Sequence, residues 1–168
     1  LYKDGLSPWE ECADLAARDP DRTVFWGSVN PLEGRKALDL MERQVGEFGA
    51  KAFKFYNVRY DYGTPYPWRM DDPRVAFPVF EKAQQLGVNL IGVHKGVPLG
   101  PQPIEHTQTW DMDGAAANFP DIAITKEQTG NWSREEGLSI MENWLSTGDQ
   151  IDAVARAHFV LNEEQFKK

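Results

Sequence analysis

Apolar residues along this chain follow two spacings, one typical of amphipathic helices and one typical of short buried strands. Helical spacing is clearest where Ala37, Met41, Val45 and Phe48 recur on one face. Short, nearly continuous apolar runs instead predict strands that are buried on both faces, as in a parallel sheet. The expected strands span residues 23–29, 52–56, 88–93, 121–125 and 151–154.

Signals for helix ends lie between these strands. Ser7 and Ser133 each open a capping box, and Gly49, Gly87 and Gly148 follow predicted helix ends. Asn30-Pro31 is expected to cap the second helix, and the third is expected to begin near Pro78, because proline breaks a helix that runs through it. The expected helices span residues 8–17, 31–48, 78–86, 110–118 and 134–147, with a last one after Asn162.

Strands that alternate with helices imply parallel pairing through right-handed crossovers. The pattern therefore predicts one α/β domain over residues 1–168, with a parallel sheet of about five strands. Two architectures fit this pattern, a partial (β/α) barrel and a flavodoxin-like doubly wound sheet. In both, binding sites gather at the carboxyl ends of the strands.

The amino-acid composition limits the kinds of molecule that this protein is expected to bind. The chain carries 18 basic and 26 acidic residues, a net charge of −8, which argues against nucleic acid or an anionic membrane as the partner. Its apolar runs are too short to span a bilayer. Cys12 is the single cysteine and falls on an apolar helix face, so it is expected in the core. No signal peptide is visible, and we expect a cytoplasmic protein.

Two long segments rich in proline and glycine follow predicted strands, at residues 57–70 and 94–108. Loops of this length are often functional. Asn57 and Lys95 come directly after strands and are candidate substrate-binding residues, as is Tyr60, although Tyr60 could instead cover the core.

His94 is the first candidate for chemistry, because a histidine at a strand's carboxyl end faces the site and imidazole suits zinc. The alternative is a histidine that is hydrogen-bonded within a loop. His106 is expected to be a solvated loop residue, and His158 is expected to pack against apolar neighbours. Capping explains Asp111 and Asp113, which sit at a predicted helix start.

A resemblance to a known family rests on three segments. KAFKFYNVRYDYG (residues 51–63), DDPRVAFPVFEKAQQLGVNLIGVHKGVPLGP (residues 71–101) and AAANFPDI (residues 115–122) resemble the amidohydrolase-related barrel family. That family includes aminocarboxymuconate-semialdehyde decarboxylase and related hydrolases. The similarity covers about residues 1–124. It implies a (β/α)8 barrel with one divalent metal, often zinc, that activates water, and it implies that His94 is a metal ligand.

The chain also departs from that family. No His-x-His pair occurs anywhere in it, and Ile124–Glu127 stands where the family places a further histidine. A zinc site needs three or four ligands. The expected cofactor is therefore none, or a single zinc ion held at an incomplete site.

A second resemblance begins where the first ends. Residues 124–154, ITKEQTGNWSREEGLSIMENWLSTGDQIDAV, are similar to a periplasmic sugar-binding protein of the ribose-binding type. The resemblance implies that Trp132 lies near a sugar cleft and is a substrate-binding candidate. Two unrelated families in one chain suggest a chimera, with residues 155–168 as a C-terminal tail or helix.

Three classes of function follow. The favoured one is a chimeric or engineered scaffold derived from an amidohydrolase barrel, with little or no catalysis. The second is a metal-dependent hydrolase or decarboxylase, and the third is a sugar-binding module. We expect no nucleic-acid or membrane partner, a possible homodimer through exposed sheet edges, and a small-molecule ligand only in the second and third classes.

Overall fold

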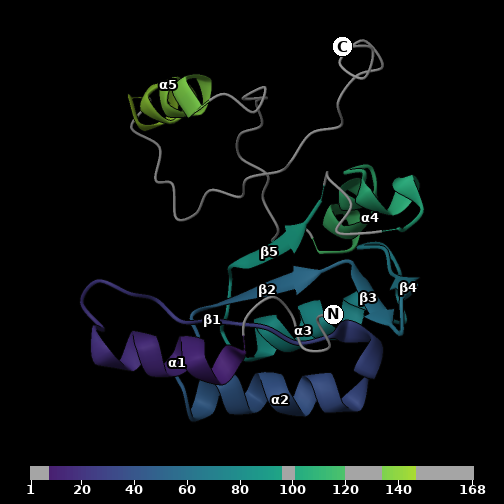
Figure 1. The fold of residues 1–168 in the computed structure, drawn as a ribbon, viewed down its shortest axis with the longest axis horizontal. Coiled ribbons are helices and arrows are strands. Elements are labelled where there is room, and N and C mark those ends of the chain that lie inside the picture. The colour runs from purple at the N-terminus through teal and green to yellow at the C-terminus, as the bar shows by residue number, and fades with distance from the viewer. Residues whose placement is uncertain (1–7, 96–100, 120–133, 147–168) are drawn as a thin grey trace.

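Three parallel strands form the main sheet of this protein. The computed structural model describes residues 8–95, 101–119 and 134–146. Strands β1 (Trp26–Gly27), β2 (Ala52–Tyr56) and β5 (Ile91–His94) lie in the order β1-β2-β5, and both neighbouring pairs are parallel. The spatial order of the strands is therefore their order along the chain, and each crossover contains one α-helix (Figure 1).

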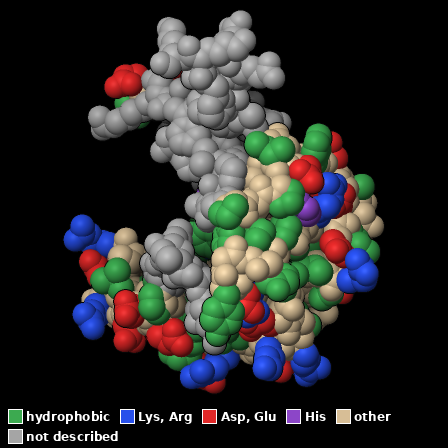
Figure 2. Space-filling view, turned by 45° about the vertical axis from the view of Figure 1, so that its right-hand side comes forward, with side chains coloured by type: hydrophobic (Ala, Val, Ile, Leu, Met, Phe, Trp, Pro, Cys, Tyr) green, Lys and Arg blue, Asp and Glu red, His purple; other side chains and the backbone are tan. Residues whose placement is uncertain are grey.

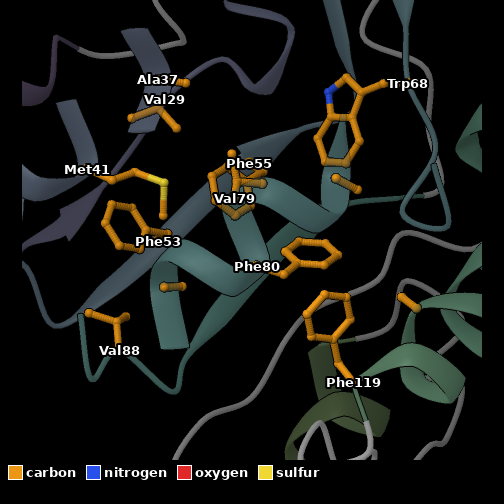
Figure 3. Close-up of a cluster of buried hydrophobic side chains, with 13 residues drawn as sticks. Val29, Ala37, Met41, Phe53, Phe55, Trp68, Val79, Phe80, Val88 and Phe119 are labelled. Atoms are coloured by element: carbon orange, nitrogen blue, oxygen red, sulfur yellow. The ribbon is translucent and has the colours of Figure 1, made fainter. Parts of the chain in front are cut away.

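Both crossover helices pack on the same face of this sheet. Helices α2 (Arg35–Gly46) and α3 (Ala76–Gln85) share one core with β2 (Figure 3). The largest apolar side chains of that core that are fully buried are Met41, Phe53, Phe55, Val79 and Phe80. Helix α1 (Trp9–Arg18) joins the same side through a smaller cluster made of Trp9, Ala13, Phe25 and Ala50. Because side chains alternate along a strand, Lys54 and Tyr56 of β2 lie on the opposite face.

The segment expected as a loop at residues 57–70 contains a β-hairpin. Strands β3 (Val58–Asp61) and β4 (Thr64–Pro67) pair antiparallel. Tyr62 and Gly63 connect them with φ values of 47° and 85°. Two consecutive positive φ angles are typical of the type I′ turn, whose twist matches that of the flanking strands. The loop prediction was therefore wrong for most of this segment.

Several predicted boundaries also shift. Helix α3 begins at Ala76, two residues before Pro78, because a proline in the first turn lacks only an N–H that has no partner within the helix. Strand β5 begins at Ile91 rather than Val88, whose N–H instead donates to the carbonyl of Ala83 at 2.9 Å and completes the end of α3. Strand β1 is two residues long, shorter than the expected span 23–29.

The second half of the chain is described in part. The short helices η1 (Pro31–Glu33) and η2 (Ile104–Thr107) follow β1 and β5. Helices α4 (Asp111–Asn118) and α5 (Arg134–Ser146) confirm the helices expected near 110 and 134. The expected strands at 121–125 and 151–154 lie outside the described residues. The α/β class is therefore confirmed, and the five-stranded sheet stays a prediction.

Charged side chains of both signs lie on the surface of the described residues. Figure 2 shows Lys and Arg side chains near Asp and Glu along the edge of the molecule. Arg35 pairs with Asp39 and Arg43 with Glu47, each one helical turn apart, at 2.7 and 3.0 Å. Such exposed pairs contribute little to stability. No helix among those described is long and apolar enough to cross a membrane.

Gln44 of α2 protects the outer edge of β1. Its side chain is fully buried; Oε1 accepts from the N–H of Ser28 at 3.1 Å and Nε2 donates to the Ser28 carbonyl at 3.0 Å. The Phe25 carbonyl points towards β2, where it accepts from the N–H of Lys51. Since backbone groups alternate in direction, those of Ser28 point away from β2. A Cβ at Gly27 would lie 2.5 Å from Oε1 of Gln44, so only glycine leaves room for this contact.

We expect Gln44→Leu to lower the free energy of unfolding by roughly 2–4 kcal/mol, because it leaves both backbone groups of Ser28 without their partner. Urea denaturation followed by circular dichroism measures this change. Lys36→Ala, an exposed position on the same helix, is the control and should shift the value by less than about 0.5 kcal/mol. Equal unfolding midpoints for the two variants would contradict the role of Gln44.

Candidate functional site

The three parallel strands all end at one edge of the sheet, and the candidate site lies there. Residues Ser28–Asn30 follow β1, Asn57 follows β2, and Lys95 follows β5, which ends at His94. The segment from η2 to α4 crosses this edge and supplies the remaining polar groups. Three of the five strand ends that the sequence predicted as site positions therefore lie at one edge, and the ends expected after residues 125 and 154 lie outside the described residues.

His94 is the last residue of β5 and lies opposite Tyr56 in the sheet register. The two rings stack with centroids 5.6 Å apart and an interplanar angle of 26°. Because Tyr56 faces away from the core that α2 and α3 cover, His94 also lies on the face opposite these helices, and its side chain is half-buried there. This is the placement that a strand-end ligand requires, and the ligand role itself stays a prediction.

Asn57 and Lys95 bind the same backbone atom. Both side chains are buried, and both donate hydrogen bonds to the carbonyl oxygen of His106 in η2. The Lys95 contact measures 3.3 Å. Two neighbouring strand ends are thus attached to one point of the η2 segment. Their expected role in substrate binding stays a prediction, and in this arrangement each side chain already donates to a group within the protein.

Asp111 completes this network from the first turn of α4. Its side chain is buried, and Oδ2 accepts from Lys95 Nζ at 2.6 Å and from the backbone N–H of Met70 at 2.8 Å. Burial lowers the pKa of Lys95, and the hydrogen bond that Lys95 donates to Asp111 opposes that shift. The sequence explained Asp111 as a cap, whereas the structure shows it as the partner of a buried lysine 16 residues away.

Three buried polar atoms of this network have no hydrogen-bond partner. They are Oδ1 of Asn57, Oδ1 of Asp111 and Nδ1 of His106. Such atoms are rare in folded proteins and cost free energy when they stay unpaired. All three have the capacity to accept a hydrogen bond, so the network is suited to a small group that donates hydrogen bonds. The expectation that His106 is a simply solvated loop residue was therefore incomplete.

Tyr60 lies on the β3–β4 hairpin, which leaves the sheet directly after Asn57. Its hydroxyl is buried without a partner, and burial raises its pKa. Arg59 beside it approaches Glu33 at 3.6 Å and Asp61 at 4.0 Å. Trp132, the remaining substrate-binding candidate, lies outside the described residues.

The described side chains do not fit a zinc site. No group of three or more His, Cys, Asp or Glu side chains converges anywhere in residues 8–95, 101–119 and 134–146. Asp111 is the buried carboxylate nearest to His94 in the sequence of the described residues. Its Oδ2 already accepts hydrogen bonds from Lys95 and from the N–H of Met70. We therefore assign no chemical step to a metal.

The family model described as amidohydrolase matches residues 5–125, which is more than half of the chain. The chain belongs to the amidohydrolase family. His94, Lys95 and Asp111 all lie within the matched amidohydrolase span. The resemblance seen in the sequence is thus confirmed at the level of the family, and the decarboxylase-like subgroup is not.

Short stretches of the chain are also similar to sugar-binding proteins. A xylitol-binding protein from Mycolicibacterium smegmatis is 43% identical over 44 residues, which is 26% of this chain and 13% of that protein. A putative rhizopine-binding protein from Rhizobium meliloti is 54% identical over 33 residues, 20% of this chain and 11% of that protein. The chain thus spans 13% or less of the length of these curated relatives. No solved structure matches the chain significantly.

We expect Asp111→Ala to lower the free energy of unfolding by about 3–5 kcal/mol, because it leaves the Lys95 ammonium buried without its counter-charge. Chemical denaturation measures the loss. The matched control is Asp113→Ala, which removes an exposed carboxylate from the same helical turn and should cost no more than about 1 kcal/mol.

The double variant Lys95→Met with Asp111→Leu should recover much of that stability, since it removes both charges together. If Asp111→Ala is no more destabilising than Asp113→Ala, the buried pair does not hold α4 against the sheet.

Proposed function

We propose that this chain is a segment of an amidohydrolase barrel that carries one metal-ligand position, His94, and has little or no hydrolytic activity by itself. The observation that carries this proposal is the position of His94 on the face opposite α2 and α3, at the carboxyl end of β5. The sequential strand order and the two crossover helices on one face support a barrel origin, because a doubly wound sheet places helices on both faces.

We propose that the metal site at His94 is incomplete because the polar groups next to it already bind other partners. Zinc sites in proteins use three or four donors. In the described residues, the polar groups next to His94 in the fold, Lys95 and Asp111, are bonded to each other. A second donor for His94 would have to come from other residues of this chain or from a further part of the protein.

The same scaffold supports an alternative, in which added ligands complete the site and the protein is a metal-dependent hydrolase or decarboxylase. The family match favours this class of reaction but does not distinguish its two members. In this alternative, His94 would be one ligand, and Tyr60 and Asn57 would lie near the substrate.

We further propose that the chain is chimeric, with a sugar-binding-type segment after the amidohydrolase span. The short matches to the xylitol-binding and putative rhizopine-binding proteins support this. Since those matches cover so little of either relative, we propose that the segment forms no complete sugar site. Trp132 would then be a remnant of a cleft whose other residues are missing.

Titration calorimetry with zinc tests the metal site. We expect binding weaker than about 1 μM, because a lone imidazole does not hold zinc tightly. The variants are His94→Ala and, as a matched control at the other described histidine, His106→Ala. Submicromolar zinc binding that His94→Ala abolishes and His106→Ala leaves unchanged would show a complete site and favour the hydrolase.

A thermal-shift measurement with xylitol tests the sugar-binding alternative. Ligand that binds only the folded state stabilises it, so a complete site would raise the melting temperature as xylitol is added. We expect no increase. A saturable increase with xylitol that Trp132→Ala removes would contradict the proposed remnant and would make this chain a polyol-binding module.

A further inference from the structure

The face of the sheet opposite α2 and α3 carries an aromatic cluster around one lysine. Trp26 of β1, Lys54 and Tyr56 of β2, and His94 of β5 belong to this face. Two distances place Trp26 and Lys54 together: a Cβ built on Gly92 would lie 3.0 Å from Trp26 Cζ3 and 3.5 Å from Lys54 Cδ. Gly92 therefore leaves the room in which the indole and the lysine stem lie side by side.

Lys54 has an unusual environment for a lysine. Its side chain is half-buried, and Nζ lies 5.4 Å from the centroid of the Tyr56 ring. Within the described part of the chain, no carboxylate pairs with it and no carbonyl accepts a hydrogen bond from it, so the Tyr56 ring is the neighbour that contacts its charge. Lysine is seldom buried without a partner of opposite charge, so burying Lys54 in this position costs free energy of folding.

Lys95 provides the internal contrast. It is more deeply buried than Lys54, but it is held by the carboxylate of Asp111 and the carbonyl of His106. Burial lowers the pKa of both lysines, and only for Lys95 does an acidic partner oppose the shift. The lowered pKa of Lys54 favours the neutral amine, which is the nucleophilic form.

We propose that Lys54 is a nucleophilic amine that forms an imine with small aldehydes on this face of the sheet. Nζ attacks the carbonyl carbon, and one proton passes from nitrogen to the carbonyl oxygen to give a carbinolamine. The hydroxyl group then leaves with the remaining N–H proton as water, and a C=N bond forms. Trp26 and Tyr56 provide apolar surface for the carbon chain of the aldehyde. This proposal does not depend on a metal at His94.

The experiment is reductive trapping on the full chain. The protein is incubated with limiting propionaldehyde and cyanoborohydride, which delivers hydride to the imine carbon and leaves a stable secondary amine. Peptide mapping by mass spectrometry then compares the rate of modification at each lysine. Lys36 and Lys51 are exposed references within the same molecule, and Lys95 is the buried, paired reference.

We expect Lys54 to be modified several-fold faster than Lys36 and Lys51, with Lys95 slowest. In urea, where the fold is lost, the four lysines should react at similar rates. Modification of Lys54 at or below the rate of Lys51 in the folded protein would overturn the proposal. A lead that persists in urea would also overturn it, because the reactivity would then come from the local sequence and not from the sheet face.

A variant separates the aromatic neighbour from the general fold. Tyr56→Leu removes the ring over which Nζ lies but keeps an apolar side chain at this position of the strand. It should slow trapping at Lys54 without changing the rate of trapping at Lys36 or Lys51. Circular dichroism confirms folding of the variant. A folded Tyr56→Leu variant with unchanged trapping at Lys54 would contradict the role given to this aromatic surface.

Discussion

The two crossover helices lie on the same face of the three-stranded sheet, and this asymmetry determines what each side chain of β2 does. Phe53 and Phe55 face the helices and are fully buried in the shared core. Burial of apolar area is the main source of folding free energy, so this face stabilises the domain. Lys54 and Tyr56 alternate with them and face away. The opposite face carries the polar and reactive groups of these strands. The two faces meet at the carboxyl edge of the sheet.

Local patterns in the sequence predicted the helices and strands whose formation depends on residues close to each other in the chain. Strand β2 has the predicted bounds, and helical spacing located α2. The hairpin at β3 and β4 was missed because Pro65 and Pro67 indicate a loop, whereas a proline is tolerated in a two-stranded ribbon where its nitrogen needs no partner. Asp111 was explained as a cap for a similar reason: its partner Lys95 is remote in sequence, and no local pattern reports such a pair.

Family membership and site chemistry depend on different kinds of information. The motif order around residues 71–101 indicated the amidohydrolase family, and the family match over residues 5–125 confirms it. A fold, however, does not imply a function, because function depends on which groups converge. Spacing along the chain could locate His94 at a strand end. It could not show that Lys95 and Asp111 neutralise each other, which depends on how α4 packs over the edge.

The contact between Gln44 and Ser28 also affects how this sheet can grow. A strand joins an existing sheet by bonding to unpaired backbone groups at its edge. At Ser28 those groups are already occupied by a side-chain amide, which acts as a one-residue substitute for a neighbouring strand. An incoming strand would have to displace Gln44 from the core before it could pair there. The two edges of the sheet therefore differ, and a further strand can pair more easily beside β5 than beside β1.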